Sequence, residues 1–502
     1  MGLFRLVFRL LRLLAVALVV LFRLLHWFAR VAWWAGRWSW KFLRYALKPR
    51  STTFGSAHWA SLWQLLAGKA LGSSAGLIVG KAFGRLLRFQ GEGALLVYAP
   101  MGSGKGLGIV VPNLLDHPGS IIVTDPKGEN AAVTGRHRET LGPVYRLDAT
   151  NPCSSHCFNP LSLIRRGSAF EPEDIAMLSD MLVMPETAEA HWDTSAKNTI
   201  AMFIGYVLHA MPKSHHTLSM VRELLVEGSE TTKRRLQKMA KMPNTTVAEQ
   251  ARALLAGYDT DETRSVLGNA AKALVIWSKD RIAGRLSMAS DFDMMDLHRR
   301  IITVYIMVPE ELLAVYAPFL RVMLGCAVIA LLRAKMLPRP EHLPLVLVDE
   351  CAALGRLDAL EKAVGYLRAY ARLILILQDL GQLQQIYGEN GARTFIAASG
   401  AQVAFRVSDT KTARDLADSI GMKTVHPRSA GFSQANTDLI RAQEQAGRSE
   451  AGRYLIDPAE VRRLPDHKAI VQLSTVRAPI LATKIKYFTE RRWKGLWDVW
   501  RA

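Results

Sequence analysis

The chain has 502 residues, more than one hydrophobic core usually supports, so its length predicts two folded units with appendages. Its formal net charge is +20, with 64 Lys and Arg against 44 Asp and Glu. A basic chain is attracted both to phosphate backbones and to anionic lipid, and charge alone does not separate the two. Four cysteines argue against a disulfide-stabilised secreted protein and are typical of a reducing cytoplasm.

The N-terminal segment combines apolar residues with regularly spaced cations. Residues 1–50 hold ten Lys or Arg and no Asp or Glu. At about 100° per residue, nine of these cations fall on one face of a helix. The nine are Arg5, Arg9, Arg12, Arg23, Arg30, Arg37, Lys41, Arg44 and Lys48.

The longest uncharged stretch of this segment is Leu13 to Phe22, ten residues, well short of the roughly 20 that span a bilayer. We therefore expect a helix that lies in the headgroup layer on the cytoplasmic face of the membrane. The alternative is one or two short spans whose arginines reach the headgroups. The absence of a small-residue cleavage site after Phe22 argues against a cleaved signal peptide.

Beyond Pro49 the sequence becomes globular, and short apolar or β-branched runs alternate with helical patterns. Such runs are typical of strands buried on both faces, so we expect an α/β fold with a mainly parallel sheet covered by helices. The predicted strands are Ala94 to Tyr98, Ser120 to Thr124, Val144 to Leu147, Ile301 to Met307, Leu343 to Val348, Leu373 to Leu377, Gln402 to Val407 and Ala469 to Leu473.

Strand-like runs are missing between Leu161 and about Arg300, where helical periodicity takes over. This region predicts an all-α domain inserted into the α/β domain. A polar stretch from Ser429 to Gly452 predicts a surface loop. The expected division is a membrane-associated segment at 1–50, an α/β domain in two parts at 51–160 and 301–490, the inserted domain at 161–300 and a tail at 491–502.

A glycine-rich loop lies between the strand Ala94 to Tyr98 and the apolar run Leu107 to Leu115, as in a Walker A motif. Its glycines let backbone N–H groups point at the β-phosphate of ATP, and Lys105 reaches the β- and γ-phosphates. Two positions depart from the general pattern: Ala99 replaces the first glycine, and Gly106 replaces the hydroxyl residue that normally binds Mg²⁺. The predicted nucleotide-binding residues are Ala99, Pro100, Met101, Gly102, Ser103, Gly104, Lys105 and Gly106.

Two acids follow the apolar strand Leu343 to Val348. Asp349 is predicted to hold Mg²⁺ through water, and Glu350 to orient or deprotonate the attacking water. The strand Leu373 to Leu377 ends in Gln378, which either senses the γ-phosphate or is a polar cap of the strand. With the glycine-rich loop upstream, these residues predict a P-loop ATPase.

These motifs resemble those of the coupling proteins of type IV secretion and conjugative DNA transfer. The resemblance runs from about Phe54 to Tyr487. Members of this family commonly carry glycine after the Walker A lysine, as this chain does at Gly106. The motifs, in order, are Gly55-Ser-Ala-His-Trp-Ala60, the loop at Ala99 to Gly106, Thr124-Asp-Pro-Lys-Gly-Glu129, Phe158-Asn-Pro-Leu161, Leu347-Val-Asp-Glu-Cys-Ala-Ala-Leu-Gly355 and Ile376-Leu-Gln-Asp-Leu-Gly-Gln-Leu383.

The resemblance implies a RecA-like P-loop domain that binds ATP and Mg²⁺ and assembles as a homo-hexamer at the bacterial inner membrane. It also implies ATP-driven delivery of relaxase-bound single-stranded DNA, or of effector proteins, to a type IV secretion channel. The family's arginine finger lies between the two acids and the glutamine, where Arg368 is the better match and Arg372 the next. The family usually has two transmembrane helices, and the segment at residues 1–48 is shorter and more basic.

Two other functions stay open. A related motor, either a chromosome-pumping translocase or the channel's assembly ATPase, shares the nucleotide motifs, but the Phe158 to Leu161 motif and Trp59-Ala60 favour a coupling protein. A receptor that binds ATP without turnover belongs to another class, and Glu350 argues against it because a scaffold has little need of a general base. No helix-turn-helix or zinc finger is visible, so DNA contact is expected to be independent of sequence.

Overall fold

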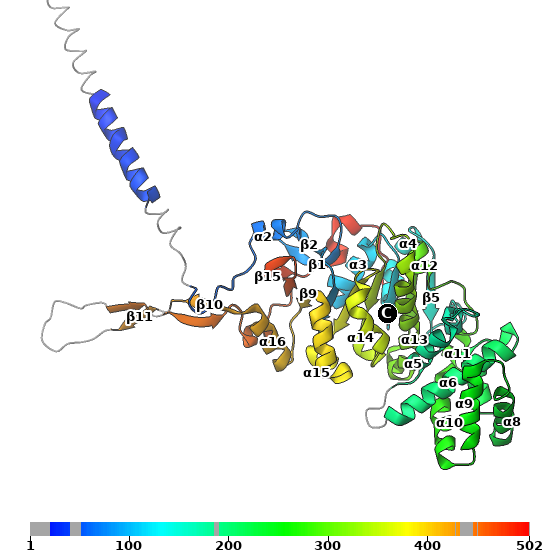
Figure 1. Ribbon diagram of the computed structural model, residues 1–502. Helices are drawn as coiled ribbons and strands as arrows, with labels where there is room; N and C mark the ends of the chain where they lie inside the picture. Colours follow the sequence, from blue (N-terminus) through cyan, green and yellow to red (C-terminus); the bar gives the residue numbers. More distant parts are fainter. Residues whose placement is uncertain are drawn as a thin grey trace, which may run out of the picture. The chain divides into compact units, whose positions relative to one another are not determined.

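The structure, a computed structural model, describes residues 21–40, 52–184, 190–426, 428–431, 445–448 and 450–500. The chain divides into two compact units. One consists of Met1–Ser56 and Lys423–Arg453, and the other of Ala57–Met422 and Tyr454–Ala502. Figure 1 shows the larger unit built around a sheet.

The sheet of the larger unit has 11 strands. They are β1 (Leu77–Ala82), β2 (Arg85–Phe89), β3 (Ala94–Tyr98), β4 (Ile121–Thr124), β5 (Val144–Asp148), β6 (Thr303–Met307), β7 (Leu345–Val348), β8 (Arg372–Leu377), β9 (Ser399–Ala404), β14 (Lys468–Leu473) and β15 (Val476–Thr483). Their order is β2-β1-β15-β14-β9-β3-β8-β7-β4-β6-β5. The stretch from β9 to β5 is parallel throughout, whereas β14, β15, β1 and β2 extend it as antiparallel strands.

Each of the eight predicted strands is present, with ends shifted by up to three residues. In β3, β4, β6 and β7 every residue is buried, because helices cover both faces of the sheet. Within this 11-stranded sheet, the strands that the sequence pattern did not predict are β1, β2 and β15. Cations and glycine interrupt their apolar residues, as Gly80 and Lys81 do in β1.

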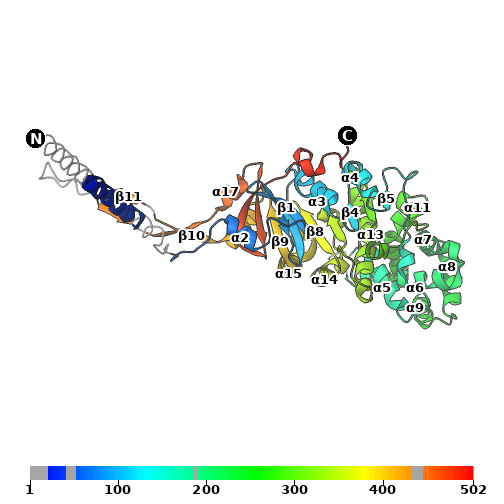
Figure 2. The same ribbon diagram turned by 90° about the horizontal axis from the view of Figure 1, so that it is seen from above.

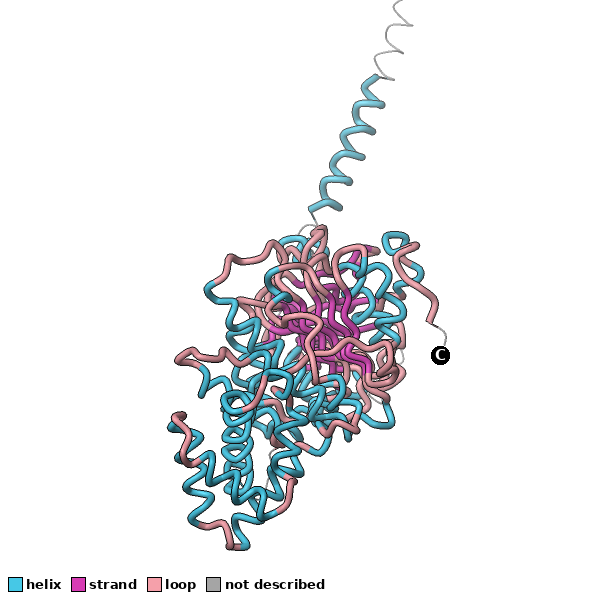
Figure 3. Tube along the Cα trace, turned by 90° about the vertical axis from the view of Figure 1, so that its right-hand side faces the viewer, coloured by secondary structure: helices cyan, strands magenta, loops and turns pink. Residues whose placement is uncertain are grey.

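Helices cover the sheet on both faces (Figures 2 and 3). Successive strand residues point to opposite faces, so Leu95 and Leu96 of β3 belong to two different cores. The core with Leu95 includes residues of α3 (Val111–Asp116) and α4 (Glu129–Glu139). The core with Leu96 includes residues of α13 (Leu313–Arg333), α14 (Asp358–Leu367), α15 (Leu380–Ala398) and α16 (Thr410–Ile420).

Within the described residues, one helical stretch has the length and hydropathy of a membrane span, namely Glu310–Met336, which contains α13. Its mean hydropathy is 2.1, and 72% of the apolar window is buried inside the fold. The apolar composition of α13 therefore matches its place in the core beneath the sheet.

The region between β5 and β6 is all-helical in its described residues, as the periodicity predicts (Figure 1). The larger unit also has two short helices that do not belong to this region, α2 (Leu62–Ala67) and α17 (Pro458–Arg462). The helices of the insertion are α5 (Glu171–Leu182), α6 (Ala190–Ala210), α7 (Leu218–Leu225), α8 (Ser229–Met239), α9 (Thr245–Ala256), α10 (Asp261–Ala273), α11 (Ile282–Leu286) and α12 (Asp296–Arg299).

The segment that follows β15 folds back onto α3 and α4. Trp493 is 1% exposed and packs in one cluster with Val111, Leu115 and Val133. The backbone N–H of Asp498 donates to the carbonyl of Val133 at 3.0 Å. This segment therefore covers the outer side of the helix that follows the glycine-rich loop.

The smaller unit contains a helix over residues 21–40, all of them exposed, and a two-stranded ribbon. The ribbon pairs β11 (Arg428–Gly431) with β12 (Gln445–Arg448), so the arms of the predicted loop are strands. A further pair joins β10 (Met422–Val425) and β13 (Ala451–Tyr454). The predicted basic face includes Arg5, Arg9, Arg12, Lys41, Arg44 and Lys48, which lie outside the described residues.

Candidate nucleotide-binding site

The glycine-rich loop leaves the sheet at the carboxyl end of β3. The N–H of Ala99 donates to the carbonyl of Leu377 at 2.7 Å, which fixes the start of the loop beside β8. Gly102 and Gly104 have φ angles of +70° and +84°, which glycine adopts without strain. The chain then forms a helical turn at Gly106–Val110 whose hydrogen bonds span five residues, and α3 follows. Such wide turns often mark functional sites.

The structure brings four of the predicted site residues together. The Lys105 Nζ lies 2.7 Å from the Asp349 Oδ1 and 3.3 Å from the Glu350 Oε2. The Gln378 Nε2 donates to the Glu350 Oε1 at 3.3 Å. The strands β3, β8 and β7 are adjacent and parallel, so the residues that follow their carboxyl ends meet at one edge of the sheet. We call this edge the nucleotide edge.

The charges of this cluster hold Lys105 in its ionised form. Burial opposes that charge, but the carboxylates of Asp349 and Glu350 outweigh the effect of burial, and the pKa of Lys105 is raised. The lysine therefore stays positive at neutral pH. Phosphate oxygens would offer it the same kind of charge-assisted bond that the two carboxylates now provide.

The Thr124 hydroxyl and a left-handed backbone conformation fix the positions of the two acids. The Thr124 Oγ1 donates to the carbonyl of Asp349 at 2.9 Å and accepts the N–H of Asp349 at 2.8 Å. Glu350 has a φ angle of +62°, a left-handed conformation that is uncommon for a residue with a side chain. Strain of this kind persists where the surroundings fix it, and it is frequent at functional sites.

A second lysine contacts the glycine-rich loop, and the sequence pattern did not reveal it. The Lys484 Nζ donates to the carbonyl of Ser103 at 2.9 Å and lies 4.1 Å from the centre of the Phe405 ring. In a trans peptide the C=O and the following N–H point in opposite directions. Because Lys484 holds the Ser103 carbonyl, the N–H of Gly104 points away from Lys484. Burial lowers the pKa of Lys484.

The two arginine-finger candidates lie at the other edge of the sheet, where the parallel strands begin. Arg368 ends α14, and its Nη1 is 3.6 Å from the Glu92 Oε2. Arg372 begins β8, and its guanidinium donates to the carbonyls of Gly91 and Gln90. The structure therefore brings neither arginine to the Lys105 cluster of the same chain, and Arg368 is the more exposed of the two.

The Asp125-Pro-Lys127 stretch caps a helix. The buried carboxylate of Asp125 accepts the N–H groups of Asn130 and Ala131 at the start of α4. Burial raises the pKa of Asp125 to about 7. The Lys127 Nζ pairs with the Glu310 Oε1 at 3.2 Å on the surface. Asp125 thus positions the helix beside β4.

A family model described as type IV secretory system conjugative DNA transfer matches residues 53–496. The chain belongs to this family. Among members of the conjugative DNA-transfer family, VirD4 of Agrobacterium fabrum is 29% identical over 462 residues, covering 88% of this chain and 67% of VirD4. The conjugal transfer protein TraG of Escherichia coli is 28% identical over 469 residues, covering 84% of this chain and 73% of TraG. The chain thus spans about two thirds of the length of VirD4.

The fold is similar to that of TrwB, a bacterial conjugative coupling protein. The unbound form aligns with a TM-score of 0.63 at 18% identity, covering 86% of this chain and 95% of the other. A structure of TrwB in complex with ADP and Mg²⁺ aligns with the same score and identity, over 86% and 96% of the two chains. These matches confirm the fold class expected for the conjugative DNA-transfer family, a P-loop α/β domain with a mainly parallel sheet.

Proposed function

We propose that this coupling protein is an ATPase that uses hydrolysis to recruit DNA or protein substrates and deliver them to a type IV secretion channel. The observation that carries the proposal is Lys105, held between Asp349 and Glu350 at the carboxyl ends of β3 and β7. A lysine in a glycine-rich loop that faces two acids at the carboxyl end of a nearby parallel strand is the arrangement that P-loop ATPases use.

The residues of the nucleotide edge fit a nucleoside triphosphate with Mg²⁺. A Cβ atom placed on Gly102, Gly104 or Gly106 meets nothing within 4 Å, so there is open space beside each of these glycines. Lys105 supplies a cation, and two carboxylates stand beside it. The TrwB complex with ADP and Mg²⁺ supports the same assignment.

ATP supplies the phosphoanhydride bond that is cleaved, and Mg²⁺ neutralises charge on its phosphates. Lys105 exchanges its carboxylate partners for β- and γ-phosphate oxygens. Asp349 would hold Mg²⁺, and Glu350 would accept a proton from the water that attacks the γ-phosphorus, with ADP as the leaving group. Gln378, which now holds the Glu350 Oε1, orients that carboxylate and relays the presence of the γ-phosphate.

The assembly that we propose is a homo-hexamer in which Arg368 of one subunit completes the nucleotide site of the next. Its substrates are relaxase-bound single-stranded DNA or effector proteins, and its partner is the secretion channel. We also propose that each subunit has a nucleotide-binding domain at 51–160 and 301–490, an inserted helical domain at 161–300 and a tail at 491–502. Membership of the conjugative DNA-transfer family supports these partners.

Two substitutions test the ATPase and separate it from a non-hydrolysing receptor. Lys105→Ala removes the positive charge that contacts the β- and γ-phosphates of ATP, so both nucleotide binding and turnover should be lost. Glu350→Gln keeps binding but removes the base, so turnover should fall by about 10²- to 10⁴-fold while ATP remains bound. ATP binding and phosphate release, measured on both variants, check this. If the unaltered protein binds ATP without releasing phosphate, the receptor is the correct function; rapid turnover by Glu350→Gln would remove Glu350 from the mechanism.

We further propose that residues 1–48 attach the protein to the cytoplasmic face of the bacterial inner membrane as an in-plane helix. In the described part, Arg23, Arg30 and Arg37 recur every seven residues and therefore share one side of the helix. The Arg37 guanidinium lies over the Trp33 ring, 5.1 Å from its centre. Cations beside interfacial tryptophans favour the boundary of an anionic bilayer.

Neutralising the three arginines together, as Arg23→Gln, Arg30→Gln and Arg37→Gln, tests this geometry. Each cation contributes about 1 kcal/mol at an anionic surface, so affinity for phosphatidylserine-containing vesicles should fall about 100-fold, with ATP binding unchanged. Vesicles of phosphatidylcholine alone serve as the control. A spanning segment behaves in the opposite way, because high salt does not extract it and the neutral variant inserts more strongly.

A further inference from the structure

A basic pocket of about 500 Å³ lies at the edge of the sheet where the parallel strands begin. It is enclosed by the β1–β2 hairpin, the end of α3 and the segment before β7, all within the larger unit. We call it the basic pocket. The cationic and imidazole side chains that line it are Arg88, Arg339, Arg372, Arg492, His117 and His342.

Positive charge exceeds negative charge in the basic pocket. Its four arginines face two acids, Asp116 and Glu341. Asp116 is already shared, since its Oδ2 accepts from the Arg88 Nη1 at 2.6 Å and its Oδ1 lies 2.7 Å from the Arg492 Nη2. Burial lowers the pKa of His117 to about 3, so this imidazole is neutral. The arginines therefore carry the charge.

Arg88 is the buried anchor of the basic pocket. Its side chain is 1% exposed, and its Nη1 donates to the Gly76 carbonyl at 3.0 Å as well as to Asp116. Its Nε and Nη2 have no hydrogen-bond partner among the residues that the structure describes. Arg88 therefore fixes a positive charge in the wall of the pocket, whereas the exposed Arg339 and Arg492 are the cations that a ligand can reach.

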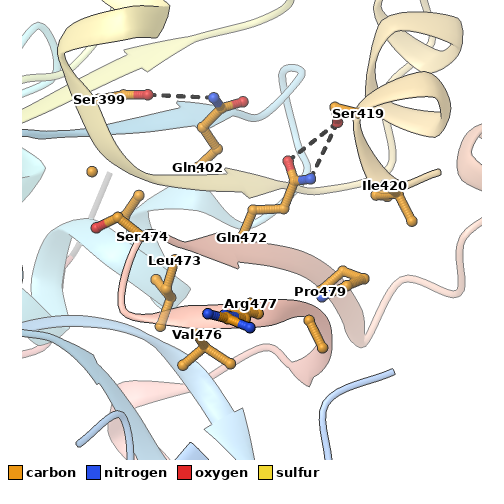
Figure 4. A pocket seen from close by; sticks show the side chains of 13 residues that line it. Ser399, Gln402, Ser419, Ile420, Gln472, Leu473, Ser474, Val476, Arg477 and Pro479 are labelled. Carbon is orange, nitrogen blue, oxygen red and sulfur yellow. Dashed lines mark hydrogen bonds between the residues drawn. The ribbon is translucent and has the colours of Figure 1, made fainter. Parts of the chain in front are cut away.

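A second pocket of the larger unit provides a comparison, because its amide side chains have hydrogen-bond partners within the pocket. This second pocket, of about 300 Å³, is lined by the start of β9 and the β14–β15 turn, and Arg477 is its one charged lining residue (Figure 4). Its amides are paired internally: Gln402 donates to the Ser399 hydroxyl at 3.3 Å, and Gln472 donates to the Ser419 hydroxyl at 3.1 Å. The second pocket has hydroxyl partners for its amides, whereas in the basic pocket two nitrogen atoms of Arg88 have none.

We propose that the basic pocket binds the phosphate groups of a small phosphorylated ligand, of the size of pyrophosphate or a nucleoside diphosphate. Guanidinium groups bind phosphate with paired, charge-assisted hydrogen bonds. The volume lies in the range of small-ligand sites, about 300 to 1,000 Å³. Lys105 lies at the opposite edge of the sheet, so this site is separate from the glycine-rich loop and does not depend on the proposed ATPase.

The test uses the Lys105→Ala chain, in which the glycine-rich loop no longer has its phosphate-binding lysine. Pyrophosphate, titrated by calorimetry, should bind this protein with one site. Adding Arg339→Ala should weaken binding about tenfold or more, because one of the exposed cations of the pocket is lost. Arg491→Ala is the matched control, since this exposed arginine precedes Arg492 but does not line the pocket. It should leave the affinity unchanged.

Three results overturn the proposal. The first is no binding of pyrophosphate, and the second is an equal loss for Arg339→Ala and Arg491→Ala, which shows general attraction to a basic surface. The third is displacement of pyrophosphate by a short single-stranded oligonucleotide at lower concentration than by ADP, which assigns the pocket to a DNA strand. Unchanged thermal unfolding of Arg339→Ala shows that the loss is local.

Discussion

The two edges of the parallel sheet treat charge in opposite ways. At the nucleotide edge one lysine lies between two carboxylates, and each charged group has a partner before any ligand arrives. At the other edge four arginines line one pocket, two of them share Asp116, and the buried Arg88 keeps unpaired donors. The difference teaches that a binding site for anions can be built in two ways. Either carboxylates of the protein balance its cations until a ligand replaces them, or the site keeps an excess of positive charge that a ligand balances.

Arg368 gives the prediction with the largest expected effect. It lies at the edge where the parallel strands begin, but we propose that it acts at the nucleotide edge of a neighbouring subunit. Arg368→Ala should lower ATP turnover by about 10³-fold or more, as expected for an arginine finger. Mixing Arg368→Ala subunits with Lys105→Ala subunits should restore part of the activity, since composite sites then contain both groups. Phosphate release by the mixture measures this.

The control for that experiment is Arg372→Ala, which removes hydrogen bonds to the Gly91 and Gln90 carbonyls. It should destabilise the fold rather than be rescued by mixing. If the mixtures stay inactive while isolated Arg368→Ala monomers hydrolyse ATP at the normal rate, the finger is another residue, and the two edges act independently.

Lys484, at the nucleotide edge, gives a prediction with a smaller expected effect. Lys484→Met removes the bond that holds the Ser103 carbonyl, so the KM for ATP should rise about tenfold with a smaller change in kcat. Because burial lowers the pKa of Lys484, its charge is lost at a lower pH than that of an ordinary lysine. The KM of the unaltered protein should therefore rise toward alkaline pH, and that of Lys484→Met should not.

Steady-state kinetics across pH check this, with the exposed Lys486→Met as a matched control two residues away. An unchanged KM in Lys484→Met contradicts a role in positioning the loop. Lys105 behaves differently, because its carboxylate partners raise its pKa and keep it charged over the same range.

The parts of the fold that could be predicted are those in which one short segment carries the whole signal. β3 and β7 are buried on both faces, so their apolar runs are visible without any neighbour. The pairing of Lys105 with Asp349 and Glu350 was also predictable, since parallel strands place their carboxyl ends at one edge. β1 and β2 were not predicted because Lys81, Arg85 and Arg88 interrupt their apolar residues, and the burial of Arg88 depends on its pairing with Asp116.

The basic pocket and Lys484 could not be predicted from the sequence. Arg88, Arg339 and Arg492 come from segments that have no pattern in common, and only the packing of the β1–β2 hairpin, the segment before β7 and the segment after β15 brings them to one cavity. Lys484 follows a strand that the pattern did not reveal, so its distance to Ser103 had no local signal. Both depend on tertiary packing rather than on the period of a single element.

The packing of Trp493 against α3 has a consequence for how the chain is made. The apolar strand β3 emerges early from the ribosome, but its two neighbours in the sheet are β8 and β9, which begin at Arg372 and Ser399. The cover of α3 is provided only once Trp493 has been synthesised. The nascent chain therefore exposes an unpaired apolar strand for most of translation, and such strands favour aggregation until the sheet is complete.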